Sequence, residues 1–251
     1  MNPAGALLRL KAVTKRFGGL AALTGVSCEV ARGQIVGIIG PNGAGKTTLF
    51  NVITGALPAT SGEIVLDGQD ILDLPPHRIV RRGIARTFQN IRLFASMTVW
   101  EHLLVAQPHR DSGIERVLPI LADRLARSRA EEVLSVLGLG AVRNRPATSL
   151  PYGLQRKVEI ARALTLAPKL LLLDEPVGGM NQDEAKEIRT LLIELRGRGV
   201  TILLIEHDMP FVMNLCEYLY VLDFGVLIAQ GEPASIRRDA RVLDAYLGTQ
   251  D

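Results

Sequence analysis

The chain has 251 residues, 47% of them hydrophobic, and a formal net charge of +3, which suits one large α/β domain. Its apolar runs are much shorter than the roughly 18–20 residues that cross a bilayer, and its N-terminus lacks the pattern of a signal peptide. Aromatic residues make up only 4%, and no dense basic stripe is present, which argues against nucleic-acid binding. We therefore expect a cytosolic protein in which the two lone cysteines, Cys28 and Cys216, are buried apolar residues.

The first third of the chain is predicted to contain short strands around one helix. The runs 7–13 and 26–30 favour strands, and the apolar run 34–39 favours a buried strand. A helix is expected from residue 49, followed by a strand at 63–66. The hairpin spacing predicts an N-terminal antiparallel β-subdomain.

Between about residues 96 and 147 the pattern becomes helical. Thr98 to Glu101 has the form of a capping box, and apolar residues then recur at helical spacing through 114–137. We expect an inserted α-helical subdomain here, within a single domain whose core comprises 1–95 and 148–251.

The remainder alternates strands and helices again. Apolar strands are expected at 170–173 and 201–205, each followed by a helix, and a hairpin is expected to join 218–222 to 226–230. This alternation indicates a mostly parallel sheet and hence the α/β fold class.

The strongest chemical signal is the run Gly40-Pro41-Asn42-Gly43-Ala44-Gly45-Lys46-Thr47-Thr48. It has the form G-x-x-x-x-G-K-T between an apolar strand and a helix, which is typical of a phosphate-binding loop. The glycines allow backbone N–H groups to point inward, and the helix N-terminus adds its positive end. Lys46 is expected to reach the β- and γ-phosphates, and the Thr47 hydroxyl to ligate Mg²⁺. A glycine-rich turn without a ligand is disfavoured by the number of matching positions, so we predict nucleoside triphosphate binding.

The second signal is a pair of acids at the end of the apolar strand 170–173. Asp174 can hold Mg²⁺ through water, and Glu175 can polarise an attacking water molecule. The alternative, an acidic loop after a core strand, loses weight because a phosphate-binding loop is also present.

Three further residues have a weak signal on their own. His207 follows the strand 201–205 and could donate to the γ-phosphate or hold the attacking water, although a structural histidine is the alternative. Gln89 could be an ordinary polar loop residue. Phe17 could stack on an adenine or fill space beside a turn.

Taken in order, these features resemble the ATP-binding cassette (ABC) ATPases over nearly the whole chain. The resemblance implies a P-loop NTPase fold, ATP and Mg²⁺ as cofactors, and head-to-tail pairs that hold each nucleotide between two subunits. By this resemblance, Phe17 occupies the adenine-stacking place, and Gln89 the glutamine-loop place that senses Mg²⁺ and the membrane partner. Asp174 takes the magnesium place, Glu175 the catalytic-base place and His207 that of the switch histidine.

The loop expected to face a partner's ATP departs from the family pattern. The usual L-S-G-G-Q stands here as Leu150-Pro151-Tyr152-Gly153-Leu154. Pro151 lacks the hydroxyl that would face the partner's γ-phosphate, whereas Gly153 and the following helix N-terminus can still bind an anion through the backbone. We count Pro151, Tyr152 and Gly153 among the nucleotide-binding residues. The loop after Glu175 reads Gly178-Gly179-Met180-Asn181 where the family commonly has S-A-L-D.

These departures resemble the larger ATPase subunit of branched-chain amino acid importers, as do the runs 86–94, 150–156, 174–181 and 245–248. The resemblance implies ATP hydrolysis that powers uptake of branched-chain amino acids or related small solutes. The implied partners are a second ATPase subunit (in a heterodimer or a homodimer), two integral membrane permease subunits and, indirectly, a solute-binding protein. The expected location is the cytoplasmic face of the inner membrane, as a peripheral protein.

Three alternatives remain open at this point. One is an ATPase of the same fold that drives export or lipopolysaccharide extraction. Another is a soluble ATP-switched binding module, although such relatives often carry two cassettes and this chain has one phosphate loop. The third is a weak hydrolase that mainly completes its partner's site.

Overall fold

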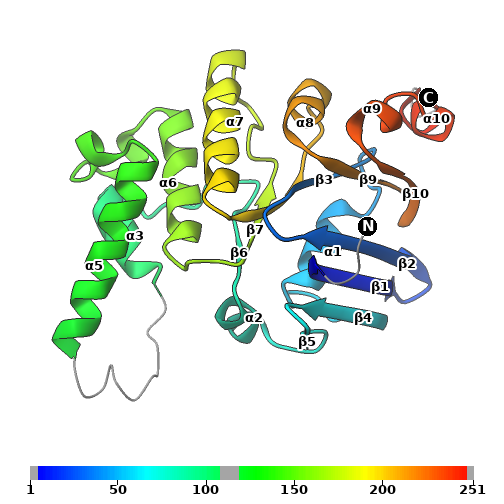
Figure 1. The fold of residues 1–251 in the computed structure, drawn as a ribbon, viewed down its shortest axis with the longest axis horizontal. Coiled ribbons are helices and arrows are strands. Elements are labelled where there is room, and N and C mark those ends of the chain that lie inside the picture. Colours follow the sequence, from blue (N-terminus) through cyan, green and yellow to red (C-terminus); the bar gives the residue numbers. More distant parts are fainter. Residues whose placement is uncertain (1–4, 108–118, 248–251) are drawn as a thin grey trace.

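The structure, a computed structural model, describes residues 5–107 and 119–247, and contains two sheets flanked by helices (Figure 1). The first sheet is antiparallel with the order β2-β1-β4-β5, which confirms the predicted β-subdomain. Its strands are β1 (Ala6–Phe17), β2 (Leu20–Ala31), β4 (Ser61–Leu66) and β5 (Gln69–Asp70). The β1–β2 hairpin extends to the pair Phe17–Leu20, beyond the expected strand ends. The sequence did not predict this outer part because it is exposed and lacks apolar alternation.

The second sheet has six strands in the order β10-β9-β3-β8-β7-β6. All neighbouring pairs are parallel except β9–β10, which confirms the mostly parallel core. Its strands are β3 (Ile35–Ile39), β6 (Ile84–Arg86), β7 (Leu170–Asp174), β8 (Thr201–Ile205), β9 (Tyr218–Asp223) and β10 (Val226–Gly231). The sequence did not predict β6, because three residues are too few to show a period.

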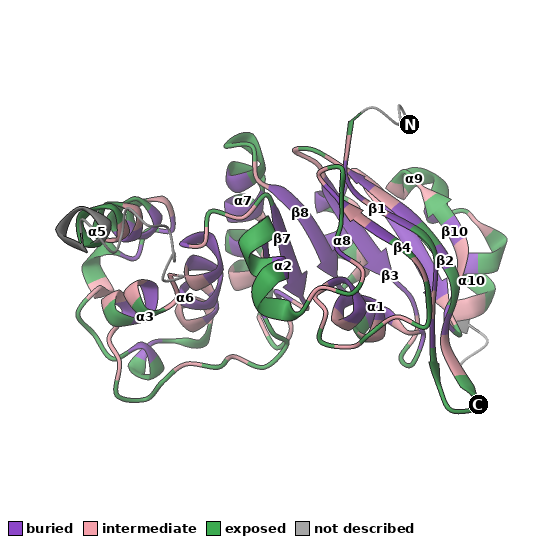
Figure 2. Ribbon diagram, turned by 90° about the horizontal axis from the view of Figure 1, so that it is seen from below, coloured by how far each residue is buried: buried purple, intermediate pink, exposed green. Residues whose placement is uncertain are grey.

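The six-stranded sheet is buried on both faces, which explains its continuous apolar strands. Successive residues of β7 point to opposite faces, so that Leu171 and Leu173 join one apolar cluster and Leu170 and Leu172 the other. Helix α1 (Lys46–Ile53) and the antiparallel sheet pack on one face. Helices α6 (Tyr152–Leu164), α7 (Gln182–Gly197) and α8 (Met209–Leu215) pack on the other (Figure 2).

A helical lobe lies at one end of the molecule (Figure 1). It contains α3 (Val99–Val105), α5 (Pro119–Val136) and the short 3₁₀ turns Gly140–Val142 and Ala147–Ser149, packed against α6. The capping box is confirmed, since Thr98 Oγ1 accepts from the Glu101 amide and Glu101 Oε2 accepts from the Thr98 amide. Of the expected run 114–137, residues 114–118 lie outside the described residues, and the subdomain boundaries stay a prediction.

The other helices within the described residues are short: α2 (Pro76–Arg82), α9 (Pro233–Ile236) and α10 (Ala240–Leu247). Among the helices within 5–107 and 119–247, none is both long enough and apolar enough to cross a membrane.

Candidate functional site

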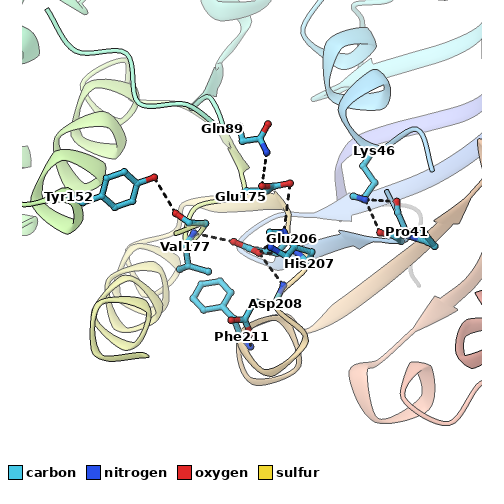
Figure 3. A network of polar contacts seen from close by, with 12 residues as sticks. Pro41, Lys46, Gln89, Tyr152, Glu175, Val177, Glu206, His207, Asp208 and Phe211 are labelled. Carbon is cyan, nitrogen blue, oxygen red and sulfur yellow. Dashed lines mark hydrogen bonds and ion pairs between the residues drawn. The ribbon is translucent and has the colours of Figure 1, made fainter. Parts of the chain in front are cut away.

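The carboxyl ends of four neighbouring parallel strands bring the predicted residues to one edge of the sheet. The phosphate-binding loop follows β3, and His207 follows its neighbour β8. Asp174 ends β7, the next strand, and Gln89 lies just beyond β6. This edge is where open α/β sheets bind ligands. Figure 3 shows Gln89, Glu175 and His207 gathered at this edge, with Lys46 on the neighbouring loop.

The loop 40–48, which is predicted to bind phosphate, has a backbone shape that suits a phosphate group. Gly43 and Gly45 have φ angles of 79° and 100°, which other residues adopt at a cost. A Cβ on Gly45 would lie 2.7 Å from the Ala22 carbonyl oxygen, whereas a Cβ on Gly43 would meet nothing within 4 Å. The loop is therefore held closely against β2 on one side and open on the other, as a phosphate cradle must be.

Lys46 lies across this loop rather than pointing into solvent. Its Nζ donates to the carbonyl oxygens of Gly40 and Pro41 at 2.7 and 2.8 Å (Figure 3). Burial lowers the pKa of Lys46, and the negative charges of Glu175 and Asp174 partly oppose that shift. Its ammonium group is thus placed beside the cradle, where phosphate oxygens can replace the carbonyls as acceptors.

Asp174 is paired with a cation that sequence reasoning did not single out. Arg86 Nη2 lies 2.8 Å from Asp174 Oδ2, and both side chains are almost buried. Arg86 Nη1 also donates to Asn51 Oδ1 at 2.7 Å, which ties the pair to α1. The sequence signal was a basic residue at the start of the run 86–94, and the separation of 88 positions from Arg86 to Asp174 concealed the pairing.

The residues proposed for Mg²⁺ are a hydroxyl, an amide and one carboxylate: Thr47, Gln89 and Asp174. Within 5–107 and 119–247, no group of three or more His, Cys, Asp and Glu side chains could hold a metal ion. Mg²⁺ commonly uses one or two carboxylates together with substrate phosphates and water, so this donor set fits an ion that arrives with a nucleotide.

Glu175 adopts an unusual backbone conformation beside two of the predicted residues. Its φ is 47°, a left-handed value that is strained for a residue with a side chain. Residues with such strained backbone conformations cluster at functional sites. Gln89 Nε2 donates to Glu175 Oε2 at 2.7 Å, and His207 Nδ1 lies 3.7 Å from Glu175 Oε1. The structure thus brings Gln89, Glu175 and His207 together.

Glu206 organises the backbone next to this cluster. Its buried carboxylate accepts from the amides of Val177, His207 and Asp208 at 3.0, 2.9 and 3.2 Å. Burial raises the pKa of Glu206, and these hydrogen bonds oppose the shift. Sequence reasoning gave Glu206 no role, although an acid at the end of an apolar strand was a visible signal.

The loop 150–154 lies apart from the Glu175 cluster but is linked to the segment that follows it. Pro151 is the N-cap of α6 and provides no side-chain cap, so the amides of the first turn are left for other acceptors. Tyr152 donates its hydroxyl to the Gly178 carbonyl at 3.1 Å (Figure 3). Pro151, with φ −54° and ψ 151°, lets α6 begin at Tyr152.

Phe17 lies at the tip of the β1–β2 hairpin, and its side chain is 46% exposed. Lys15 Nζ is 4.9 Å from its ring centroid. The same hairpin contributes Ala22 beside Gly45, but the adenine-stacking role of Phe17 stays a prediction.

Comparisons with known proteins agree with this geometry. The model of the ABC transporter family matches residues 23–178, and a model described as branched-chain amino acid ATP-binding cassette transporter matches residues 226–251. A high-affinity branched-chain amino acid transport ATP-binding protein of Pseudomonas aeruginosa is 44% identical over 96% of this chain and 98% of its own. Its counterpart in Salmonella typhimurium is 46% identical with the same coverage.

More distant relatives and solved structures point to the same family. A lipopolysaccharide export system ATP-binding protein of Haemophilus influenzae is 34% identical over 97% of this chain and 98% of its own. A solved nucleotide-free ATP-binding cassette from an ABC transporter superimposes with a TM-score of 0.86 at 35% identity, covering 96% of this chain and 98% of that one. The fold, the nucleotide-binding loop and these matches together show that the chain belongs to the ABC transporter family, as an ATP-hydrolysing cassette with the C-terminal region of the branched-chain amino acid group.

Proposed function

We propose that this cassette powers an importer of branched-chain amino acids or related small solutes. The observation that carries the proposal is the 44–46% identity to transport ATP-binding proteins of that class over nearly the full length. The separate match over residues 226–251 supports the same subgroup. The cargo itself would contact the permeases rather than this chain.

The site supports a division of labour among its residues during ATP hydrolysis. The loop from Gly40 to Thr48 would hold the phosphates of Mg²⁺-ATP, with Lys46 beside the β- and γ-phosphate oxygens. Thr47, Gln89 and Asp174 would hold the ion, whose charge stabilises the transferred phosphoryl group. Glu175 would polarise the attacking water.

His207 completes this arrangement from the neighbouring strand end. Its side chain is 60% exposed and lies 3.7 Å from Glu175 Oε1, so it can reach a water molecule or the γ-phosphate next to that carboxylate. Glu206 supports this placement because its carboxylate accepts a hydrogen bond from the backbone amide of His207.

A second ATPase subunit would complete each nucleotide site. Pro151 and the first turn of α6, with Tyr152 and Gly153, would face the partner's ATP, and Phe17 would face the adenine of this chain's own nucleotide. A solved cassette that is 28% identical, with a TM-score of 0.74, is described as a dimer bound to ADP and phosphate, which supports a pair of cassettes. Whether the pair consists of two copies of this chain or of two different subunits is an outcome of the experiment below.

Two integral membrane permease subunits would hold the cassette at the cytoplasmic face of the inner membrane, with a solute-binding protein acting on the far side. Exposed aromatic side chains near Gln89 support a contact there: Phe88 is 44% exposed and Phe94 52% exposed. Movement of the helical lobe and the Gln89 loop would pass to the permeases through this surface.

Co-expression with permease subunits of a branched-chain amino acid importer tests the proposal. We expect a membrane complex that contains this chain and a second cassette, and ATP-driven uptake of radiolabelled leucine into vesicles. A matched complex carrying Glu175→Gln should assemble but not transport. Isolation with lipopolysaccharide-extraction permeases would favour the export alternative suggested by the 34% identical relative. Isolation with ribosomes or DNA would contradict a transport role.

A further inference from the structure

The loop that carries Gln89 is held by the buried Arg156 of α6, the helix against which the helical lobe packs. Arg156 Nη1 donates to the Phe88 carbonyl at 2.8 Å, and Nη2 donates to the Gln89 carbonyl at 2.9 Å. The side chain of the same Gln89 reaches in the other direction, to Glu175 Oε2 at 2.7 Å. Gln89 is therefore held through its backbone by one helix and through its amide by the catalytic edge of the sheet.

The burial of Arg156 needs an explanation beyond stability. Arg156 is 1% exposed, and its Nη1 lies 2.7 Å from Oε2 of Glu159, which is 4% exposed. Among the described residues, Arg156 Nε and Glu159 Oε1 have no hydrogen-bond partner. A buried ion pair that is not fully satisfied is often no more stable than two apolar side chains of similar size. The guanidinium of Arg156 then matters for the carbonyl groups of Phe88 and Gln89 that it holds in place.

The same guanidinium also touches the loop at the start of its own helix. Arg156 Nη2 lies 3.3 Å from the Tyr152 hydroxyl, which in turn donates to the Gly178 carbonyl at 3.1 Å. Gly178 belongs to the segment that follows Glu175. One buried side chain thus joins the Gln89 loop directly to Tyr152 and, through Tyr152, to the segment behind the catalytic base.

Two other side chains, one on α6 and one on α3 of the lobe, hold the same loop further along. Arg162 Nη1, also on α6, donates to the Arg92 carbonyl at 2.6 Å. Nε2 of the buried His102, on α3, accepts a hydrogen bond from the Phe94 amide at 2.8 Å. These contacts do not involve Arg156, and they likewise attach the loop 88–94 to α6 and to α3, which packs against α6.

We propose that Arg156 is a positioning residue for ATP hydrolysis, which fixes the Gln89 backbone so that its amide stays against Glu175 and makes the loop 88–94 move with α6 and the lobe packed against that helix. A movement of the lobe then shifts Gln89 and Tyr152 together and changes the contact with Glu175. The proposal rests on the assignment of Glu175 as the base, but the attachment of the loop can be measured without it.

The test uses the full-length chain carrying Arg156→Met together with Glu159→Met. This pair removes the bonds to the loop without leaving a lone buried charge, so the fold is expected to persist. Lys157→Met is the matched control, because Lys157 is the next residue of α6 and pairs with Glu187 of α7 instead. Arg156→Lys serves as the conservative variant, since one ammonium group cannot reproduce the planar fork of guanidinium donors.

Hydrogen exchange in the nucleotide-free protein should show the loss of attachment. We expect amides in 88–94 to exchange at least about tenfold faster in the double variant, with little change in the sheet. For ATP hydrolysis, kcat should fall about tenfold while KM stays within about twofold, because the phosphate-binding loop is untouched. Arg156→Lys should fall between the parent and the double variant, and Lys157→Met should match the parent.

Unchanged exchange in a folded double variant would overturn the proposal, whatever happens to kcat. A fall in kcat without faster exchange, or equal effects of Lys157→Met, would also overturn it, because Arg156 would then act by another route. If Glu175→Gln retained normal turnover while the exchange result held, the catalytic-base assignment would fail and the attachment of the loop would stand.

Discussion

The Gln89 amide donates its Nε2 hydrogen to Glu175 Oε2 over 2.7 Å, so the residue expected to sense the membrane partner touches the residue expected to activate water. This orientation leaves Gln89 Oε1 free to ligate Mg²⁺, which prefers oxygen ligands. A single side chain can therefore connect the ion, the base and the loop that faces the permeases.

Replacing this amide with a carboxylate should impair hydrolysis. In Gln89→Glu, two carboxylates would lie within contact distance, and like charges at this range raise the pKa of one of them. We expect kcat to fall by about tenfold or more, since general-base catalysis contributes about 10²–10⁴-fold. Asn90→Asp, an exposed neighbour, is the control in the same ATPase assay. Equal rates for Gln89→Glu and the parent would contradict the contact.

Lys46→Ala should weaken nucleotide binding by about 10–100-fold, because each hydrogen bond between a charged group and its partner contributes about 1.5–3 kcal/mol. Calorimetry with a non-hydrolysable ATP analogue measures the change. Lys11→Ala is a suitable control, since Lys11 is exposed and pairs with Glu63 on the antiparallel sheet. Unaltered affinity in Lys46→Ala would refute the role of the loop in phosphate binding.

Arg86→Met should destabilise the protein. Arg86→Lys, which keeps a positive charge, should lower the stability less. Removal of Arg86 leaves the buried Asp174 carboxylate without its partner, and such a change costs about 3–5 kcal/mol. A chain of this size should lose about 6–20 °C in melting temperature, at about 2–4 °C per kcal/mol. Arg82→Met, at the exposed end of α2, should melt close to the parent. A Tm within a degree or two for Arg86→Met would show that the pair is energetically neutral.

His102 should make the protein less stable below neutral pH. Burial lowers the pKa of His102, and its ring is held neutral because Nδ1 lies 2.8 Å from the Thr98 carbonyl while Nε2 accepts the Phe94 amide. The unfolded chain, with a His pKa of about 6.5, then binds the proton more readily than the folded one. The contribution of His102 is therefore complete above about pH 6.5 and is lost as the pH falls towards the lower, folded pKa.

One such histidine can change the free energy of unfolding by at most about 1.4 kcal/mol per pH unit. Urea unfolding at pH 7.5 and pH 5.5 measures it, and His102→Gln, which cannot take up a proton there, should remove part of the difference. His77, which lies on the exposed helix α2, provides the control His77→Gln. An identical pH dependence in the parent and His102→Gln would rule out this effect.

Local patterns predicted much of this fold and site. The apolar runs of β7 and β8, the capping box at Thr98 and the phosphate-binding loop are each specified by a few adjacent residues, and the structure contains them. The mostly parallel sheet then followed from the alternation of strands and helices. Because carboxyl ends of parallel strands share an edge, Glu175 and His207, which follow two predicted strands, could be expected to meet there.

What sequence reasoning did not find depends on tertiary contacts. Strand β6 is too short to show a period, yet it places Arg86 beside Asp174. The reach of Arg156 to carbonyls 67 and 68 positions earlier has no sequence signature, because the partners are backbone atoms. The roles of Phe17 and Pro151 involve a nucleotide and a second subunit, and they stay predictions.

Turnover and assembly of Glu175→Gln test the account of this site most directly. The variant keeps the size of the side chain and removes its ability to accept a proton, while leaving Lys46 and the phosphate-binding loop intact. We expect hydrolysis to fall by about 10²-fold or more, normal ATP affinity, and a stable dimer in Mg²⁺-ATP by light scattering. ATP hydrolysis at the parent rate by this variant would contradict the assignment of Glu175 as the catalytic base.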